Sequence, residues 1–515
     1  MNEYTIRIDP KKKVRTLNNK VGTFCIWDYR ENFFGKGEDG QIKKANPFAE
    51  RVQFMTATGG NAERDLFREP ENFAVKDDYD FSPLIRACKN ALRLGVKPFI
   101  KTGSIPLKFT HDPQIGVFDV NMHAPDVMDD YYHYIYALCE ALKAEFGTEE
   151  VQSWGWGVFT EFENMQWFKA SEDSTEAGRL FCDVYDYTIA AITDSLGDGV
   201  TVGAHAMMMR TIKLIVFEPE QFIRHCAQER NAKNGKPVKL DYMGFSFYDS
   251  RPYKMHSMTF AQVANLIRKT ARKYGLNDLR IGCDEGRINS GMDNKELSPR
   301  TVGFRYQAAM DADLLWQMVN FDVDYFAAWS YRSGGLMEGL KSLGSHMAEN
   351  YYRMVGMTQL ETDPADEASV LGIAPLDFRA HSIAATDGKG KTAVMVYNYQ
   401  PQNIFFEEPT KVRIELPTKK ADGESTVECR FIDDSANFFP KWVVDRDAKG
   451  LETKGRWSED SPEVMTEGFD PAPYEQYSHL IPKTLKTEVK NGVETLELSM
   501  VGNSVVFVEF AEKTL

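Results

Sequence analysis

Two glutamates of this 515-residue chain stand where a short apolar run gives way to polar residues. Glu161 follows the aromatic and small residues at 154–159, and Glu285 follows the apolar and small residues at 281–283. Two carboxylates that face each other across a cleft can cleave a glycosidic bond, because one protonates the leaving oxygen while the other attacks the anomeric carbon or activates water. The alternative for each glutamate is a loop position with a salt bridge.

The runs that end in these glutamates belong to a series of eight short segments with the composition of β-strands. They are rich in β-branched, aromatic and small residues, and most end in polar residues or turns. Helical patterns lie between them at 81–94, 129–146, 260–274 and 300–319, and the first three are followed by glycine, a common residue after a helix. The strand segments are 22–27, 52–55, 96–101, 154–159, 200–204, 242–247, 279–283 and 325–329.

Strands that alternate with helices from about residue 21 to residue 355 predict an α/β fold, a (β/α)8 TIM barrel. A doubly wound open sheet is the alternative, but the glycine-rich phosphate fingerprint after its first strand is absent. The reactive groups of such barrels come from the C-terminal ends of the strands. A barrel of eight strands can bring two carboxylates within the roughly 5–5.5 Å that a double displacement needs.

The pattern changes after about residue 366. Alternating runs at 391–398, 411–416, 425–432, 493–499 and 504–510, separated by turns, predict a C-terminal β-sandwich. The alternating segment 4–8 precedes the barrel and is expected to join that sheet. We therefore expect an N-terminal strand and linker at 1–20, a catalytic barrel at 21–360 and a β-sandwich domain at 361–515.

Other polar and aromatic residues at the strand ends are candidates for substrate binding. Trp329 can offer an apolar face to a sugar, and His205 can approach the sugar or the acid/base group. Lys101 can meet an anionic substituent such as a uronate carboxylate, while Asn61 and Arg64 are candidate sugar contacts. The structural alternatives are a core tryptophan, a core histidine, a turn and a surface ion pair.

The motifs around these positions resemble a clan A glycoside hydrolase, and most of all glycoside hydrolase family 39, the β-xylosidase and α-L-iduronidase family. The family's acid/base motif Val-Trp-Asn-Glu-Pro-Asn has its counterpart in Val158-Phe-Thr-Glu-Phe-Glu163, which places the acid/base on Glu161. The family's Asp-Phe-Ile-Ser-Phe-His-Thr-Tyr strand is similar to Asp241-Tyr-Met-Gly-Phe-Ser-Phe-Tyr248. Its nucleophile segment Thr-Glu-Trp corresponds to Cys283-Asp-Glu-Gly286 and implies Glu285 as nucleophile. The resemblance spans most of residues 21–360.

The resemblance also implies roles for several neighbours. Tyr248 matches the tyrosine that hydrogen-bonds the nucleophile, and Glu338 lies on the loop where the family has a sugar-binding glutamate. The clan's asparagine before the acid/base, which binds the sugar 2-hydroxyl, is Thr160 here. The family's histidine on the sixth strand is Ser246, and the proline after the acid/base is Phe162. These differences change the sugar site, so the sugar, its anomer and the linkage do not carry over.

The leading hypothesis is a retaining, exo-acting glycoside hydrolase of β-xylosidase type that acts on short oligosaccharides or glycosides without a cofactor or metal. Arg64 is a candidate for the cation that keeps Glu285 ionised. Glu163 is a rival for the acid/base, and Asp284 is expected to point away because side chains alternate along a strand. Two alternatives stay open: a carbohydrate-binding pseudo-enzyme, and a metal-dependent isomerase or aldolase that uses His205, Asp284 and Glu285.

Composition narrows the classes of partner. Hydrophobic residues make up 43% and charged residues 27%, which is typical of a globular protein. The net charge of −15 argues against general binding to nucleic acid or to anionic membranes. Seven scattered cysteines without a CxxC pair, and no visible signal segment, predict free thiols and a cytoplasmic location. We expect a small carbohydrate substrate, no nucleic-acid or membrane partner, and a possible homo-oligomer.

Overall fold

The computed structural model describes residues 3–26, 48–209, 213–249, 258–288, 305–329, 340–363, 381–399, 409–450 and 469–511. Eight parallel strands form a closed barrel in sequence order, and the pairing of its first strand with its last closes it. This confirms the predicted TIM barrel. Its strands are β2 (Thr23–Ile26), β3 (Arg51–Phe54), β4 (Lys97–Thr102), β5 (Gly155–Val158), β6 (Thr201–Ala206), β7 (Tyr242–Asp249), β8 (Arg280–Ile288) and β9 (Phe326–Trp329).

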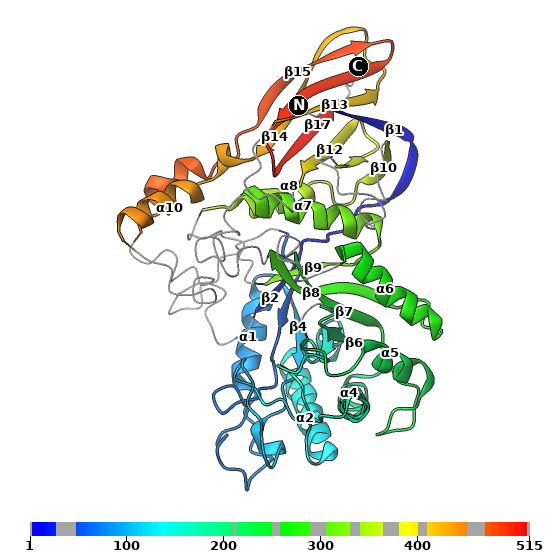
Figure 1. Ribbon diagram of the computed structural model, residues 1–515, viewed down its shortest axis with the longest axis vertical. Helices are drawn as coiled ribbons and strands as arrows, with labels where there is room; N and C mark the ends of the chain where they lie inside the picture. Colours follow the sequence, from blue (N-terminus) through cyan, green and yellow to red (C-terminus); the bar gives the residue numbers. More distant parts are fainter. Residues whose placement is uncertain are drawn as a thin grey trace.

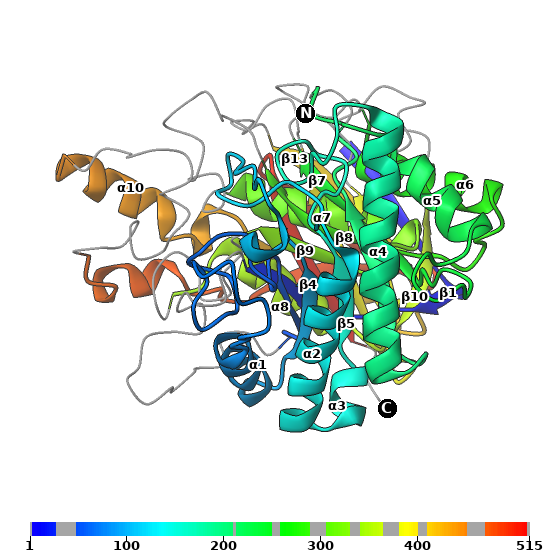
Figure 2. The same ribbon diagram turned by 90° about the horizontal axis from the view of Figure 1, so that it is seen from below.

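Helices cover the outside of this barrel (Figures 1 and 2). The predicted helices at 81–94, 129–146 and 260–274 are confirmed, and the described part of the fourth begins at residue 305. Local sequence sets several ends: Asp173 and Thr259 cap the helices that follow them, and Gly147 ends the second helix with a φ of 84°. The helices are α1 (Ser82–Arg93), α2 (Met128–Phe146), α3 (Thr148–Gln152), α4 (Ser174–Leu196), α5 (Pro219–Gln228), α6 (Phe260–Lys273), α7 (Arg305–Asn320) and α8 (Leu343–Tyr352).

A second set of strands lies beyond α7 and α8, at the upper end of the molecule in Figure 1. The N-terminal strand joins it as expected, because β1 pairs antiparallel with β10 and parallel with β13. The strands are β1 (Glu3–Thr16), β10 (Thr358–Asp363), β11 (His381–Thr386), β12 (Lys391–Asn398), β13 (Thr410–Pro417), β14 (Gly423–Ile432), β15 (Lys483–Lys490), β16 (Val493–Met500) and β17 (Ser504–Ala511). The short helix α10 (Phe439–Ala448) follows β14.

These nine strands form one closed circuit, whereas the sequence predicted a sandwich of two sheets. The long first strand explains the difference. β1 bridges strands that a sandwich would leave on separate sheets, and its ladder to β10 shifts register near Asp9 and Lys13, where the strand bends. A pattern of alternating residues predicts that strands have one buried face, but it does not say which edges pair.

The interior of the first barrel is filled in layers, as expected for eight strands. At the bottom, the guanidinium of Arg51 lies 5.8 Å from the ring centre of Phe99 and 5.5 Å from that of Tyr325. Glycines on neighbouring strands make room for such large side chains, because a Cβ at Gly203 would come within 2.5 Å of the Tyr242 ring. Two residues further along the strands the filling becomes polar, and this second layer lies directly beneath the two glutamates.

All seven cysteines are buried and free, as expected from their spacing. Within the described part of the chain, none of the helices combines the length and the apolar character that crossing a bilayer requires.

Candidate active site

Glu161 and Glu285 come together at the C-terminal end of the barrel. Glu161 follows β5 and is 4% exposed, and Glu285 lies on β8 and is 7% exposed. One carboxylate oxygen of each, together with a ring nitrogen of His205, lies within 4.8 Å of the others. The barrel therefore places two buried carboxylates side by side at the end where such folds hold their reactive groups.

The backbone that carries Glu161 is held in an uncommon conformation. Phe159 has a φ of 61° and Glu161 a φ of 45°, in the left-handed region that residues with a side chain seldom adopt. Backbone hydrogen bonds maintain it: the Phe159 N–H donates to Thr102 O (2.7 Å) and the Asn164 N–H to Glu161 O (2.7 Å). Such strain is typical of functional sites, because the surrounding structure must hold the residue in place.

Both oxygens of the Glu161 carboxylate accept hydrogen bonds from neighbouring side chains. The Ser246 hydroxyl donates to Oε1 (2.6 Å), and the Asn164 amide donates to Oε2 (2.7 Å). Burial raises the pKa of Glu161, while these two donors, the charge of Lys101 and the Trp167 indole act in the opposite direction. The net direction is upward, so Glu161 keeps its proton to a higher pH than an exposed glutamate.

Glu285 has a different environment. The Tyr248 hydroxyl donates to its Oε1, as the resemblance implied. The two residues face each other because the β7–β8 ladder shifts register, so that Phe245 pairs with Cys283 and Ser246 pairs with Glu285. A tyrosine that donates to a carboxylate favours its ionised form, and the two glutamates are thus set up for different tasks.

Asp284 also has an unexpected place, because the extra residue at this register shift lets two successive side chains, Asp284 and Glu285, face the interior. We expected it to point away from the barrel, but its side chain is fully buried inside and pairs with Lys101 Nζ at 2.9 Å. Because the shift leaves Asp284 without a direct partner residue on β7, the strand does not alternate there. Gly244 accommodates the side chain, since a Cβ at Gly244 would lie 2.3 Å from the carboxylate.

Lys101 and His205 belong to the polar layer beneath the glutamates. Both side chains are fully buried, and Lys101 Nζ lies 2.7 Å from His205 Nδ1. The ammonium is held inside the barrel by Asp284 and His205, so it is not placed to meet the carboxylate of a bound uronate. His205 Nε2 lies 2.8 Å from Ser246 Oγ, which links the layer to Glu161.

Three other residues that the sequence suggested as sugar contacts make hydrogen bonds within the protein. The Thr160 hydroxyl donates to Met55 O (3.0 Å). The Asn61 amide donates to Asp119 O (2.6 Å) and so anchors a loop on the barrel rim, and its own carbonyl oxygen accepts the Arg64 N–H (2.9 Å). The Arg64 side chain is partly buried on that turn. The cation whose charge acts on Glu161 is Lys101, which the sequence had suggested for another role.

Glu163, the rival acid/base, is fully buried and turned toward the backbone. Its carboxylate accepts the N–H of Met207 (2.9 Å) and that of Met208 (2.8 Å). These bonds tie the loop after β5 to the end of β6. Both oxygens are therefore occupied by main-chain donors, which favours Glu161 as the group that faces the substrate.

Two predicted contacts cannot be placed. Glu338 lies outside the described residues, and so does the side chain of Trp329, whose backbone ends β9 and pairs with Cys25. Sequence reasoning in turn overlooked Asn164 as a partner of Glu161. The signal for it was a turn, because an asparagine three positions after Glu161 can close a turn and point its amide back.

The cluster of Glu161, His205 and Glu285 has a donor set that can hold a metal ion. Both nitrogens of His205 already have protein partners, Lys101 Nζ and Ser246 Oγ. An ammonium 2.7 Å from a ring nitrogen also repels a cation. The donor set therefore fits a metal poorly, which weighs against the alternative of a metal-dependent isomerase or aldolase.

A (β/α)8 barrel whose strand ends β5 and β8 each present a buried glutamate has the fold and site of a glycoside hydrolase. The chain belongs to the glycosyl hydrolases family 39, whose model matches residues 39–333, more than half of its length. This establishes the resemblance noted from the sequence and identifies the protein as a glycoside hydrolase.

Solved structures share the fold over the whole chain at low identity. A monomeric β-xylosidase from Caulobacter crescentus matches with a TM-score of 0.64 at 17% identity, covering 99% of this chain and 100% of that one. A family 39 enzyme from Xanthomonas axonopodis pv. citri matches with a TM-score of 0.66 at 16% identity, covering 99% and 98%. A bacterial orthologue of human α-L-iduronidase matches with a TM-score of 0.67 at 14% identity, covering 100% and 85%.

Proposed function

We propose that this protein is a retaining, exo-acting glycoside hydrolase of β-xylosidase type, with Glu285 as nucleophile and Glu161 as acid/base. The observation that carries this proposal is the approach of the two carboxylates, with one oxygen of each within 4.8 Å. Retaining enzymes hold their carboxyl groups roughly 5–5.5 Å apart, and inverting enzymes roughly 6.5–9.5 Å apart to admit a water. The short separation favours direct attack by a carboxylate.

The reaction then takes two steps. Glu285 attacks the anomeric carbon, the bond to the leaving oxygen breaks, and Glu161 gives that oxygen its proton. In the second step, water adds to the anomeric carbon, its proton passes to Glu161, and the bond to Glu285 breaks. The raised pKa of Glu161 suits the first step, and the hydrogen bond from Tyr248 steadies Glu285 as a carboxylate.

An uncharged glycone is part of the proposal. Two of the similar structures are a β-xylosidase and an orthologue of an α-L-iduronidase. Lys101, the cation expected to meet a uronate, is fully buried and paired with Asp284. We therefore place a neutral pentoside ahead of a uronide, and short oligosaccharides or simple glycosides ahead of polymers.

The test is a panel of aryl α- and β-glycosides and uronides with and without EDTA, followed by two variants. We expect release from an aryl β-xyloside that EDTA does not change. We also expect Glu161→Ala and Glu285→Ala to lower kcat/KM by roughly 10²–10⁴-fold or more. Azide should rescue both variants and give glycosyl azides of opposite anomeric configuration, because it replaces a different carboxylate in each.

The exposed Glu63→Ala serves as control and should keep its activity. The same anomer from both rescued variants, or dependence of turnover on a divalent metal, would contradict the assignment of roles. Activity on uronides alone would leave the two carboxylates in place but overturn the neutral glycone.

A further inference from the structure

A continuous chain of hydrogen bonds runs from the barrel interior to Glu161. Lys101 Nζ lies 2.7 Å from His205 Nδ1, His205 Nε2 lies 2.8 Å from Ser246 Oγ, and Ser246 Oγ lies 2.6 Å from Glu161 Oε1. The side chains of Lys101, His205 and Ser246 are completely buried. They lie on β4, β6 and β7; the last two are neighbours in the barrel, and β5 separates them from β4.

The direction of this chain is determined by chemistry. A lysine ammonium carries only donors, so His205 Nδ1 must accept from Lys101. The ring hydrogen is then on Nε2 and is donated to Ser246, whose single hydroxyl hydrogen goes to Glu161. Burial and the charge of Lys101 hold the pKa of His205 well below its usual value, in keeping with a neutral ring.

The buried end of the chain is firmly held. Lys101 Nζ pairs with Asp284 Oδ2 (2.9 Å), and the other oxygen of Asp284 accepts from Tyr325 (2.5 Å) and Gln53 (3.2 Å). Gly157 leaves space for the lysine, since a Cβ there would lie 3.0 Å from Lys101 Cγ. An ammonium held in this way cannot leave the imidazole, so the tautomer of His205 is fixed.

Glu161 must hold a proton for the first step and be a carboxylate for the second. Burial favours the proton, and the carboxylate of Glu285, within 4.8 Å, would repel a second negative charge. The donors Ser246, Asn164 and Trp167 and the charge of Lys101 favour the carboxylate. Without those donors, a buried glutamate beside another acid would keep its proton and serve poorly as a base.

We propose that Ser246, His205 and Lys101 are positioning residues that act as a unit, with the hydroxyl of Ser246 stabilising and orienting the Glu161 carboxylate for the second step. This rests on the proposed role of Glu161. No proton travels through the unit: the hydrogen on each link stays on its donor, and the water proton of the second step is taken up by Glu161 itself. The unit sets the balance between the protonated and the ionised form of Glu161.

The test is the pH dependence of kcat/KM on a β-xyloside with a poor leaving group, which requires a protonated acid. In Ser246→Ala the carboxylate loses a donor, so its pKa rises and the alkaline limb moves to higher pH by about one unit. Ser246→Thr keeps the hydroxyl and should return the limb toward the parent value. Ser382→Ala, at a buried serine of β11 in the other barrel, is the matched control and should leave the limb in place.

Lys101→Met should move the alkaline limb in the same direction. If the residues act as a unit, adding it to Ser246→Ala should give a smaller shift than the sum of the two single shifts. Should Lys101→Met fail to fold, because it leaves Asp284 buried without its cation, Ser246→Ala and Ser246→Thr still decide the question.

Loss of activity in Ser246→Ala with an unmoved alkaline limb would show that the serine is structural only, and would overturn the unit. Fully additive shifts would overturn the link through His205. A failure of the proposed function looks different, because Glu161→Ala would then keep its activity or escape rescue by azide, whatever the Ser246 variants do.

Discussion

Two glutamates only two positions apart, Glu161 and Glu163, differ completely in their surroundings. The first faces its neighbour Glu285 and accepts from side-chain donors. The second accepts two backbone N–H groups and is fully buried, and burial raises its pKa to about 7. At the residue scale, one glutamate is placed for proton transfer and the other joins two loops.

Glu163→Gln should therefore destabilise the protein, whereas Glu161→Gln should mainly remove activity. A glutamine at 163 offers one acceptor oxygen and turns an NH2 group toward the second backbone N–H, which costs about 1–3 kcal/mol of unfolding free energy. Thermal unfolding at pH 5 measures this loss, because Glu163 is still protonated there in the folded protein and the cost of ionising the parent does not offset it. Azide should not restore the activity that Glu163→Gln loses.

The exposed Glu149→Gln is the control and should unfold like the parent protein. A Glu163→Gln variant of unchanged stability, with activity restored by azide, would instead make Glu163 the acid/base.

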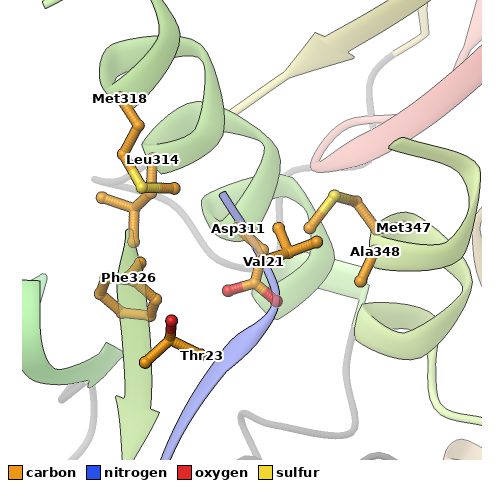
Figure 3. A pocket seen from close by; sticks show the side chains of 8 residues that line it. All are labelled: Val21, Thr23, Asp311, Leu314, Met318, Phe326, Met347 and Ala348. Atoms are coloured by element: carbon orange, nitrogen blue, oxygen red, sulfur yellow. The ribbon is translucent and has the colours of Figure 1, made fainter. Parts of the chain in front are cut away.

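At the scale of elements, α7 carries an acidic side chain into an apolar environment. Figure 3 shows Asp311 among the apolar side chains that line a small pocket between the helix, β2, β9 and α8. Gln307 donates to its Oδ1 at 2.6 Å. Burial raises the pKa of Asp311 to about 7, so ionising it in the folded protein is costly.

Asp311→Asn should stabilise the protein at high pH and change it little at low pH. The pKa of Asp311 in the folded protein lies above the unfolded value near 4. The group therefore does not reduce the unfolding free energy of the parent below pH 4, and it reduces that free energy increasingly as the pH rises to 7 and beyond. We expect a gain of about 1–3 kcal/mol in the unfolding free energy at pH 8, allowing for partial exposure. The measurement is the difference in Tm between variant and parent at pH 5 and pH 8.

The exposed Asp198→Asn serves as control and should not show this pH-dependent gain. A gain of equal size at both pH values would mean that packing, and not the charge of Asp311, is responsible.

At the scale of the whole molecule, a continuous apolar interface joins the two barrels, although the second barrel also has a core of its own. The apolar cluster between the first barrel and its helices continues through Tyr397, Tyr399 and Phe507 of the second set of strands and the segment after β12. Polar contacts cross the same boundary: the Tyr397 hydroxyl donates to Asp313 (3.1 Å) on α7, and the Arg15 guanidinium donates to Val319 O (2.6 Å). The two parts should therefore unfold together.

Calorimetry should show a single unfolding transition for the full chain. Tyr397→Ala should lower it as a whole, because it leaves a cavity in the shared interface worth about 3–5 kcal/mol. The 71%-exposed Ile481→Ala should leave the transition in place. Two separate transitions, with only one of them moved by Tyr397→Ala, would show that the two barrels are independent.

Much of the fold could be predicted from the local pattern of apolar and polar residues. The alternation of strand-like and helical segments predicted the barrel, since each period depends only on which residues face a core. The same reasoning placed Glu161 and Glu285 at strand ends and hence at one edge. It missed the closure of the second barrel by β1, because edge pairing depends on where distant strands meet.

The sequence by itself thus determined the barrel and the end of it at which the two carboxylates lie, because both follow from the spacing of apolar residues along the chain. Only the tertiary structure decided what surrounds each side chain. It paired Lys101 with Asp284 and His205, and it bonded the Asn61 amide to Asp119 of a loop. Sequence alone does not show these partners, because they come from segments that are far apart in the chain. A register shift between β7 and β8, which no composition reveals, let Asp284 and Glu285 both face the interior.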